Sequence, residues 1–447
     1  MTEFLIYSKR CFINRKFIEA TLHIKNKKIH SIYEGHHTLK NVAFLDYRNL
    51  IVMPGIIDAH VHINEPGRAD WEGFETATKA AAMGGITTLI EMPLNASPVT
   101  TTVEAFQVKQ KQAYNKLHVH CGFYGGVIPS NLNTVESLIK AGVFGIKGFL
   151  SASGIDEFPK VEKQHLERIA SILKRYNLPL LLHCELEDDY VPEVGNPKSY
   201  NAYLQSRPQR WEVNAIKMAI DLQQQFGIKV HIVHLSASDG IPLVKEAKQV
   251  SDKLTVETCP HYLFFNSENI PNGAPIYKCA PPIREKQNQE LLWNFLEEDG
   301  FDFLASDHSP APSEVKQLET GNFFKAWGGI SGLQFTVPVL FSEWKKRGLK
   351  LETLIPMLTE KPAMFLGLNS QKGLLIEGLD ADITVLDDAK VITVSESIIA
   401  HKHKATPYLK QKLQGVVDQV FVNGYHVVQN GEFKDAHKGT ILLKNII

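Results

Sequence analysis

The residues best suited to chemistry are histidines and an acid that follow apolar, strand-like runs. His60 and His62 stand two apart at the end of one such run, and residues i and i+2 of a strand point to the same face. Two imidazoles on one face can chelate a single cation. A His-x-His pair alone is a weak signal, because packing explains most such pairs, and it gains force only from further ligands.

A lone lysine occupies the centre of an apolar, glycine-flanked run, as Lys147 between Ile146 and Gly148. The simpler explanation is a lysine at a sheet edge whose amine reaches solvent. The functional interpretation is an amine that takes up CO₂ and becomes a carbamate. Burial raises the neutral fraction of lysine, and two divalent cations would hold the carbamate as a bridging anionic ligand.

Three further ligand-type residues each close an apolar run: His183, His234 and Asp307. If these runs are barrel strands, the side chains enter the barrel mouth, where active sites of such barrels are built. One histidine at a strand end is usually structural. A succession of such positions after the His-x-His pair predicts a metal site.

Three other histidines compete for the same role. His231 precedes His234 by three residues, so along a strand the two are expected on opposite faces, and we choose His234. His261 and His308 are interpreted as supporting or packing residues.

The elements that must position these residues alternate along the chain. Strand candidates cover residues 57–62, 89–92, 119–124, 145–150, 180–184, 230–235, 254–259 and 301–306. Helix candidates between them cover residues 71–83, 134–141, 163–176, 211–226, 242–250 and 288–298. Strict alternation of this length predicts an α/β fold, a parallel sheet closed into a TIM (β/α)₈ barrel.

Both ends of the chain are rich in β-branched and aromatic residues instead. Asn423-Gly424, between two apolar runs, is a strong hairpin signal. Because neither terminal segment is long enough to form a domain alone, we expect one small β-sandwich built from both segments. The predicted boundaries are residues 1–53 and 371–447 for the β-sandwich and 54–370 for the barrel.

Composition excludes several classes of protein. The 447 residues are 44% hydrophobic and 22% charged, with a formal net charge of −1, so nothing indicates disorder or a field that would attract nucleic acid. No apolar run approaches the length of a membrane span, and the first ten residues do not resemble a secretory signal. Five dispersed cysteines without a CxxC pair fit a reducing, cytoplasmic setting.

Taken together, the motifs resemble those of the cyclic amidohydrolases of the amidohydrolase superfamily: dihydroorotases, hydantoinases and allantoinases. The resemblance covers nearly the whole chain. Its motifs are Met53-Pro-Gly-Ile-Ile-Asp58 before the His-x-His pair, the lone lysine, the two later histidines, the aspartate, Thr258-Cys-Pro-His261, Cys279-Ala-Pro-Pro-Ile-Arg284 and the tail residues 372–382. The resemblance also implies the barrel with a β-sandwich from both termini.

Within that group the chain is most similar to the allantoinases, which open the hydantoin ring of allantoin to allantoate in purine and ureide catabolism. The motifs that carry this similarity are His62-Ile-Asn-Glu-Pro-Gly-Arg-Ala-Asp-Trp-Glu-Gly-Phe74, Met92-Pro-Leu-Asn95, Asp307-His-Ser-Pro310 and Lys325-Ala-Trp-Gly-Gly-Ile-Ser-Gly-Leu-Gln334. One departure is Ala311, where many allantoinases carry a cysteine.

The resemblance implies a role for each ligand. His60, His62 and Asp307 would bind the more buried cation and His183 and His234 the second, with Lys147 bridging both as an N6-carboxylysine. A metal-bridging hydroxide would attack the ring carbonyl, and Asp307 would accept its proton and pass it to the departing nitrogen. These ligand types accept zinc, cobalt, manganese or iron; zinc is our first choice.

Substrate contacts are expected at Asn64, Asn95, Gly329 and Ser331. Dihydroorotases resembling this chain place an arginine two residues after the His-x-His pair, where it can pair with the substrate carboxylate. Here that position is the neutral Asn64, which favours the uncharged ureido group of allantoin. The alternative for both asparagines is that they only cap turns.

Three other functions are compatible with parts of this pattern. Hydantoinase (dihydropyrimidinase) and dihydroorotase share the chemistry, and a non-catalytic scaffold is a distant alternative because some hydantoinase relatives assemble without metal. A scaffold has no physical need for all six ligands. We expect a small-molecule substrate, no nucleic-acid or membrane partner, and a homo-oligomer, since the family commonly forms tetramers.

Overall fold

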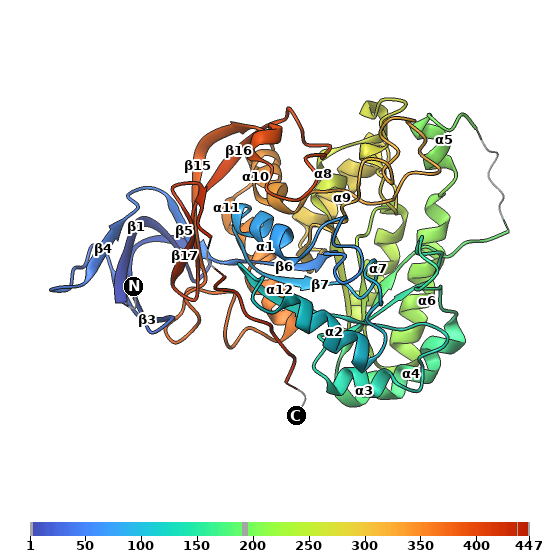
Figure 1. Ribbon diagram of the computed structural model, residues 1–447, viewed down its shortest axis with the longest axis horizontal. Coiled ribbons are helices and arrows are strands. Elements are labelled where there is room, and N and C mark those ends of the chain that lie inside the picture. The colour runs from blue at the N-terminus through green and yellow to red at the C-terminus, as the bar shows by residue number, and fades with distance from the viewer. Residues whose placement is uncertain (1–2, 190–194, 436, 446–447) are drawn as a thin grey trace.

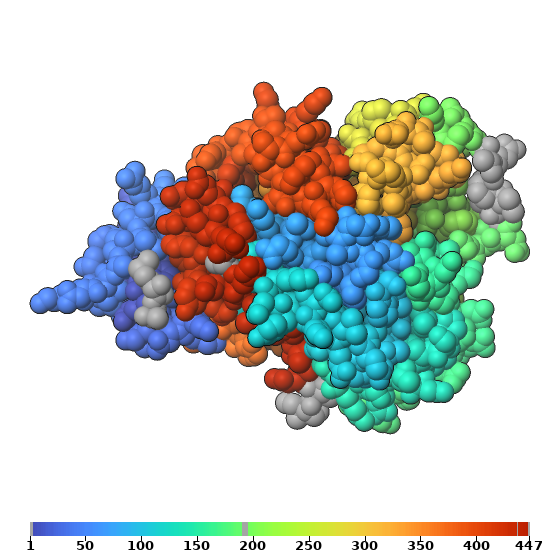
Figure 2. Space-filling view, in the orientation of Figure 1, coloured from blue at the N-terminus to red at the C-terminus, as the bar shows by residue number. Residues whose placement is uncertain are grey.

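The chain forms two parts that lie side by side. The computed structural model describes residues 3–189, 195–435 and 437–445. In Figure 1, helices surround one set of strands, and a second set, built from both ends of the chain, lies beside them. Figure 2 shows the two ends of the chain adjoining on the surface next to the barrel. This is the predicted arrangement of barrel and terminal β-structure.

Eight parallel strands of the described residues form the barrel. They are β6 (Ile56–Val61), β7 (Ile86–Glu91), β8 (His120–Phe123), β10 (Ile146–Phe149), β11 (Pro179–His183), β12 (Lys229–Ile232), β13 (Leu254–Thr258) and β14 (Phe303–Leu304). The short β9 (Gly125–Gly126) extends the sheet beside β10. The strands fall into two hydrogen-bonded sheets, β6-β7-β8 and β14-β13-β12-β11-β10-β9. At one junction, next to β6 and β14, the His62 amide donates to the His308 carbonyl at 2.8 Å. At the other, next to β8 and β10, the Phe144 amide donates to the Phe123 carbonyl at 2.9 Å. These bonds close the barrel.

Helices cover the outside of the barrel. They are α1 (Phe74–Met83), α2 (Val103–Ala113), α3 (Val135–Lys140), α4 (Lys163–Tyr176), α5 (Tyr200–Gln205), α6 (Gln209–Phe226), α7 (Ile241–Val250), α8 (Pro260–Phe264), α9 (Lys286–Glu297), α10 (Thr336–Lys346), α11 (Leu351–Leu358) and α12 (Glu360–Leu366). Single 3₁₀ turns are η1 (Ser238–Gly240), η2 (Ser267–Asn269), η3 (Pro275–Tyr277), η4 (Leu333–Phe335) and η5 (Glu396–Ile398).

Helix α4 shows how the local sequence sets an element. Its buried residues Leu166, Ile169, Ala170 and Leu173 recur every three or four positions, which places them on one face against the barrel. It ends at Asn177, whose φ of 51° stops the helix. Its bounds are those predicted from the sequence.

Helix α1 begins three residues later than predicted. The sequence indicated a start at residue 71, but α1 begins at Phe74 because Gly73 has a φ of 127°, outside the helical region. Trp71 lies instead in the loop before the helix, where its ring packs edge-on against Trp327 at 5.0 Å.

The second part is a nine-stranded sheet. Its strands are β1 (Glu3–Ile13), β2 (Lys16–Lys25), β3 (Lys28–Glu34), β4 (Ala43–Asp46), β5 (Ile51–Pro54), β15 (Ile383–Thr393), β16 (Lys412–Val422), β17 (Tyr425–Gln429) and β18 (Glu432–Phe433). The order is β18-β17-β16-β15-β5-β1-β2-β3, with β4 paired to β1. The rings of Phe4 and Phe421 stack at 5.6 Å although their strands are not neighbours, so the sheet curls over its own apolar core.

The predicted hairpin lies at Asn423-Gly424, where both residues have positive φ, 52° and 74°, as a tight two-residue turn requires. Strand β15 covers Ile383–Thr393, and its pairing with β16 is irregular between Asp387 and Val391.

The chain returns to the barrel after the sheet. The Gly439 amide donates to the Leu117 carbonyl at 3.0 Å, and Cys121 and Ile441 form a parallel bridge beside β8. This segment, residues 439–444, therefore packs on the barrel rather than in the sheet, although it falls within the predicted range 371–447. The domain boundaries stay a prediction.

All five cysteines are free and buried. Among the described helices, none combines the length and the hydropathy needed to cross a bilayer.

Candidate metal centre and cavity

The first group of predicted ligands meets at the ends of β6 and β14. One Asp307 carboxylate oxygen lies 3.1 Å from the Nε2 atom of His60 and 3.3 Å from that of His62. Asp307 follows β14 with a φ of 46°, and this turn directs the carboxylate toward β6. All three side chains are buried, and their ligand atoms are close enough together to hold one ion.

The second group consists of His183 and His234. His183 ends β11, whereas His234 stands two residues beyond β12 with a φ of 42°. The Nδ1 atom of His183 and the Nε2 atom of His234 face each other at 3.0 Å. The rings of His234 and His60 are 5.5 Å apart, so the two groups adjoin.

Lys147 lies in β10 beside both groups. Its side chain is fully buried and, among the described residues, its amine has no hydrogen-bond partner. Burial lowers the pKa of Lys147 to about 8. Burial also lowers the pKa of His62 to about 4, to which the nearby Lys147 ammonium contributes. The amine is thus buried, unpaired and adjacent to imidazoles of the barrel mouth.

This arrangement suits a pair of divalent cations. Imidazole and carboxylate are ligands of zinc and of neighbouring transition metals. A buried amine without a partner is costly unless something neutralises or binds it, and a carbamate between two cations would do so. The residues present therefore fit the binuclear centre that the superfamily implies.

A buried carboxylate that we did not predict supports the first group. Glu257, on β13, accepts from Nδ1 of His60 at 2.5 Å and from Nε2 of His231 at 3.1 Å. Such a contact sets the ring orientation and tautomer of a metal ligand. The sequence feature that could have indicated Glu257 is its position as the one acidic residue within the apolar run 254–259.

Replacing Glu257 by glutamine should weaken metal binding about 10–100-fold, the range typical of groups that orient a ligand. The glutamine side chain has the same size, but its neutral amide is a weaker hydrogen-bond acceptor for His60 than the carboxylate is. The dissociation constant for Zn²⁺, measured by competition with a chelator, checks this. Glu297→Gln, at the exposed end of α9, is the matched control, and equal affinities in both variants would contradict the assignment.

His231 does not point away from the barrel interior as predicted. His231 and His234 were expected on opposite faces, but the ring of His231 contacts Glu257 inside the barrel and stacks on Phe303 at 5.0 Å. The alternation fails because β12 ends at Ile232 and the positive φ of His234 turns its side chain inward again. His231 is fully buried and is not among the residues that line the cavity.

The other two competing histidines lie close to the site. A ring nitrogen of His261 lies within 4.8 Å of both Asp307 and Cys259. Nδ1 of His308 accepts from the Leu333 amide at 3.4 Å, and the ring is fully buried. Both positions suit the supporting role expected for them.

A cavity of about 640 Å³ opens above the ligands. Of the four predicted substrate contacts, Asn95 lines it, while Asn64, Gly329 and Ser331 do not. The Asn64 amide donates to the Pro310 carbonyl at 3.2 Å, and its φ is 69°, so it stabilises a turn. A Cβ at Gly329 would lie 2.5 Å from the Ser309 carbonyl oxygen, so this glycine permits close packing between the two loops.

Several cavity residues escaped the sequence analysis. Arg68, Arg207 and Lys278 all line the cavity, although none of them occupies the position two residues after the His-x-His pair, which is Asn64. Each guanidinium, however, already has a carboxylate partner: Arg68 pairs with Glu157 at 2.8 Å and Arg207 with Glu185 at 2.9 Å. They lie on loops beyond the strand ends, where strand periodicity gives no information.

Comparison with known proteins agrees with this architecture. The pattern of the Amidohydrolase family matches residues 51–427, and the chain belongs to this family. Allantoinase of Arabidopsis thaliana is 42% identical over 98% of this chain and 90% of its own length. Allantoinase of Streptomyces avermitilis is also 42% identical, over 88% and 87%. A solved L-hydantoinase (dihydropyrimidinase) from Arthrobacter aurescens superposes with a TM-score of 0.93 at 31% identity, over 99% of this chain and 100% of its own. The predicted family and TIM-barrel fold are confirmed.

Proposed function

We propose that this protein is an allantoinase, a metal-dependent hydrolase that opens the hydantoin ring of allantoin to give allantoate. The observation that carries the proposal is that two groups of candidate metal ligands line one cavity beside the buried amine of Lys147, which has no hydrogen-bond partner among the described residues. The similarity to allantoinases over most of the chain favours this member of the family over the others.

The six ligand residues divide the work of the site. His60, His62 and Asp307 would hold one divalent cation, His183 and His234 the other, and carboxylated Lys147 would join them. Zinc is our first choice, and cobalt, manganese and iron suit the same ligands. When bound, such a pair supplies Lewis acidity and a water of lowered pKa at neutral pH.

Asp307 is the proton carrier of the proposed reaction. Its carboxylate is buried at the cavity floor, where it can accept a proton from the attacking water. The same group can then protonate the ring nitrogen, which cannot leave as an anion. Within this scheme Asn95 is a positioning residue, because its amide lies 3.2 Å from Nδ1 of His62.

The cavity walls favour a neutral substrate. Because Arg68 and Arg207 are already paired with glutamates, a substrate carboxylate would have to compete for them. Lys278 donates to the main-chain carbonyls of Phe324 and Ala326, and burial lowers its pKa to about 7. A neutral ureido group requires no cation and can bind through hydrogen bonds to polar groups of the cavity wall.

Purified protein offered allantoin, hydantoin and dihydroorotate should hydrolyse allantoin best. We expect weak action on unsubstituted hydantoin, and a kcat/KM for dihydroorotate at least about 100-fold lower, since an uncompensated carboxylate costs several kcal/mol. Metal analysis of the same sample is the control for a loaded centre. A kcat/KM for dihydroorotate equal to or above that for allantoin would overturn the substrate assignment.

The main alternative is hydantoinase (dihydropyrimidinase), favoured by the close structural match to an enzyme of that name. The same assay decides, because a hydantoinase would prefer hydantoin. A scaffold without activity would neither hydrolyse these compounds nor hold metal.

Assembly and location complete the proposal. We keep the predicted homo-oligomer, with a tetramer as its form, and the cytoplasmic location suggested by five unpaired cysteines. One relative is named a mitochondrial allantoinase, so fractionation of cells that make this chain tests the location.

A further inference from the structure

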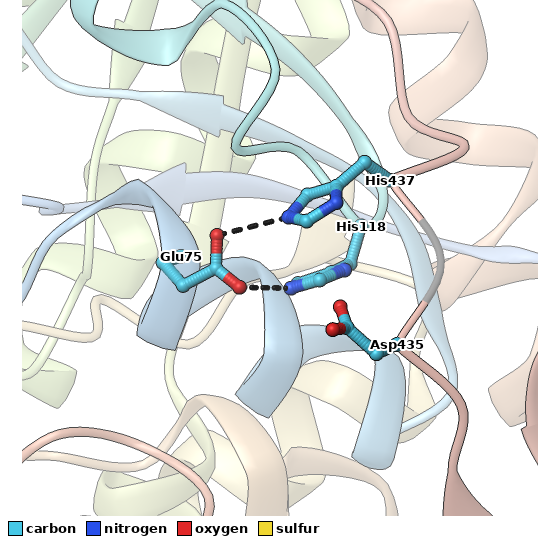
Figure 3. Close-up of side chains that lie close together, drawn as sticks. All are labelled: Glu75, His118, Asp435 and His437. Atoms are coloured by element: carbon cyan, nitrogen blue, oxygen red, sulfur yellow. Dashed lines mark hydrogen bonds and ion pairs between the residues drawn. The ribbon is translucent and has the colours of Figure 1, made fainter.

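A second cluster of metal-ligand types lies on the outside of the barrel. It comprises Glu75, His118, Asp435 and His437, whose ligand atoms all lie within 4.8 Å of one another. Figure 3 shows both imidazoles directing a nitrogen at the Glu75 carboxylate. None of these residues belongs to the catalytic group or lines the substrate cavity.

The cluster joins three segments that are far apart in sequence. Glu75 lies in the first turn of α1, His118 just before β8, and Asp435 and His437 after β18. Glu75 contacts the Nε2 atom of His118 at 2.8 Å through one oxygen and that of His437 at 3.0 Å through the other. The carboxylate therefore bridges the edges of the two rings.

The geometry resembles a ligand set more than a set of ion pairs. The two imidazoles stack with centroids 4.5 Å apart and planes at 24°, so two protonated rings would repel each other. The carboxylate of Asp435 has no hydrogen bond or ion pair within the described part of the chain, although Lys79, Lys402 and Lys404 line the same surface cavity. An acid without a cation thus lies beside two nitrogen ligands and a second acid.

We propose that Glu75, His118, Asp435 and His437 bind a divalent transition metal ion, and that this ion is Zn²⁺. Two imidazoles select against calcium and magnesium, which prefer oxygen ligands, and the two carboxylates balance the charge of the dication. Ligand distances near 2.0–2.2 Å require the side chains to move closer together. Glu75 and His437 are 51% and 40% exposed and are free to do so.

His118 gives the site a fixed anchor. Its ring is fully buried, and the edge of the Phe433 ring packs against it at 4.7 Å and 88°. The ion would tie the segment after β18 to α1 and to the segment before β8. Metal binding would then be coupled to the packing of this segment against α1, because the four ligands lie together only when the segment is packed there.

Zinc binding to the full-length protein tests the site without relying on turnover. Wild type, His437→Ala and Asp435→Asn, stripped with a chelator, are titrated with ZnCl₂ by calorimetry, and bound zinc is counted after gel filtration. Both variants should bind one equivalent fewer than wild type while hydrolysing allantoin at the wild-type rate. Zinc should also raise the thermal midpoint of wild type more than that of either variant.

His30→Ala removes an exposed histidine elsewhere and should leave the zinc count unchanged. Lys147→Ala separates this site from the proposed catalytic pair, since it should retain the outer ion and lose the others. Equal zinc counts in wild type, His437→Ala and Asp435→Asn would overturn the site, whatever the result for the catalytic centre.

Discussion

Replacing Lys147 by alanine should remove most of the catalytic metal and nearly all hydrolysis of allantoin. The amine lies buried beside both ligand groups and has no hydrogen-bond partner among the described residues, so a carbamate there would be the ligand shared by both cations. Without it, five neutral or singly charged side chains must hold two dications close together. Metal content and turnover of the purified variant measure the loss.

Short carboxylic acids such as acetate or propionate should partly restore both metal and activity, because each can place a carboxylate in the space left by the side chain. Lys109→Ala is the matched control, since Lys109 is also a fully buried lysine but forms an ion pair with Glu91. That variant leaves a buried acid unpaired and should lose about 3–5 kcal/mol of stability, with no rescue by carboxylic acids. Full metal and turnover in Lys147→Ala would refute the bridging role.

Asp307→Asn should lower kcat by at least about 10²–10⁴-fold, the usual contribution of an acid–base group. Asparagine has nearly the same size but cannot take up the proton from water or return it to the ring nitrogen. Because Asp307 is also a predicted ligand, kcat is to be measured at saturating metal with the metal content of each sample determined.

Asp382→Asn provides a comparison for Asp307. Asp382 is a buried carboxylate that pairs with Lys372 at 2.5 Å and directly precedes β15 of the terminal sheet. Its loss should reduce the free energy of unfolding but leave kcat intact at temperatures where the protein stays folded. If Asp307→Asn with metal bound turned over allantoin at a near-normal rate, another group would have to move the proton.

The candidate ligands could be predicted from the sequence because a position at the end of an apolar run is a local property. In a parallel barrel each strand ends at the same face, so His183 and Asp307 can be assigned from the apolar runs before them. The family resemblance then ordered them into two groups, and the structure brings the members of each group together. Whether they bind metal stays a prediction.

What the sequence could not predict depends on contacts between distant segments. The contact of Glu257 with His60 spans 197 residues and requires the register of β13 against the rest of the barrel. The outer cluster depends on where the segment after β18 returns to the barrel. Arg68 and Trp327 reach the cavity through loops, whose course has no periodicity to read.

The pairing of β5 with β15 has a consequence for synthesis of the protein. These strands are antiparallel neighbours in the terminal sheet, yet residue 54 leaves the ribosome long before residue 383. At about 5–20 residues per second, roughly 15–70 s pass between them. During that interval the first strands have an open edge able to pair with another chain. A cell making this protein therefore gains from a chaperone that covers the nascent N-terminal strands, and slow translation should increase aggregation rather than reduce it.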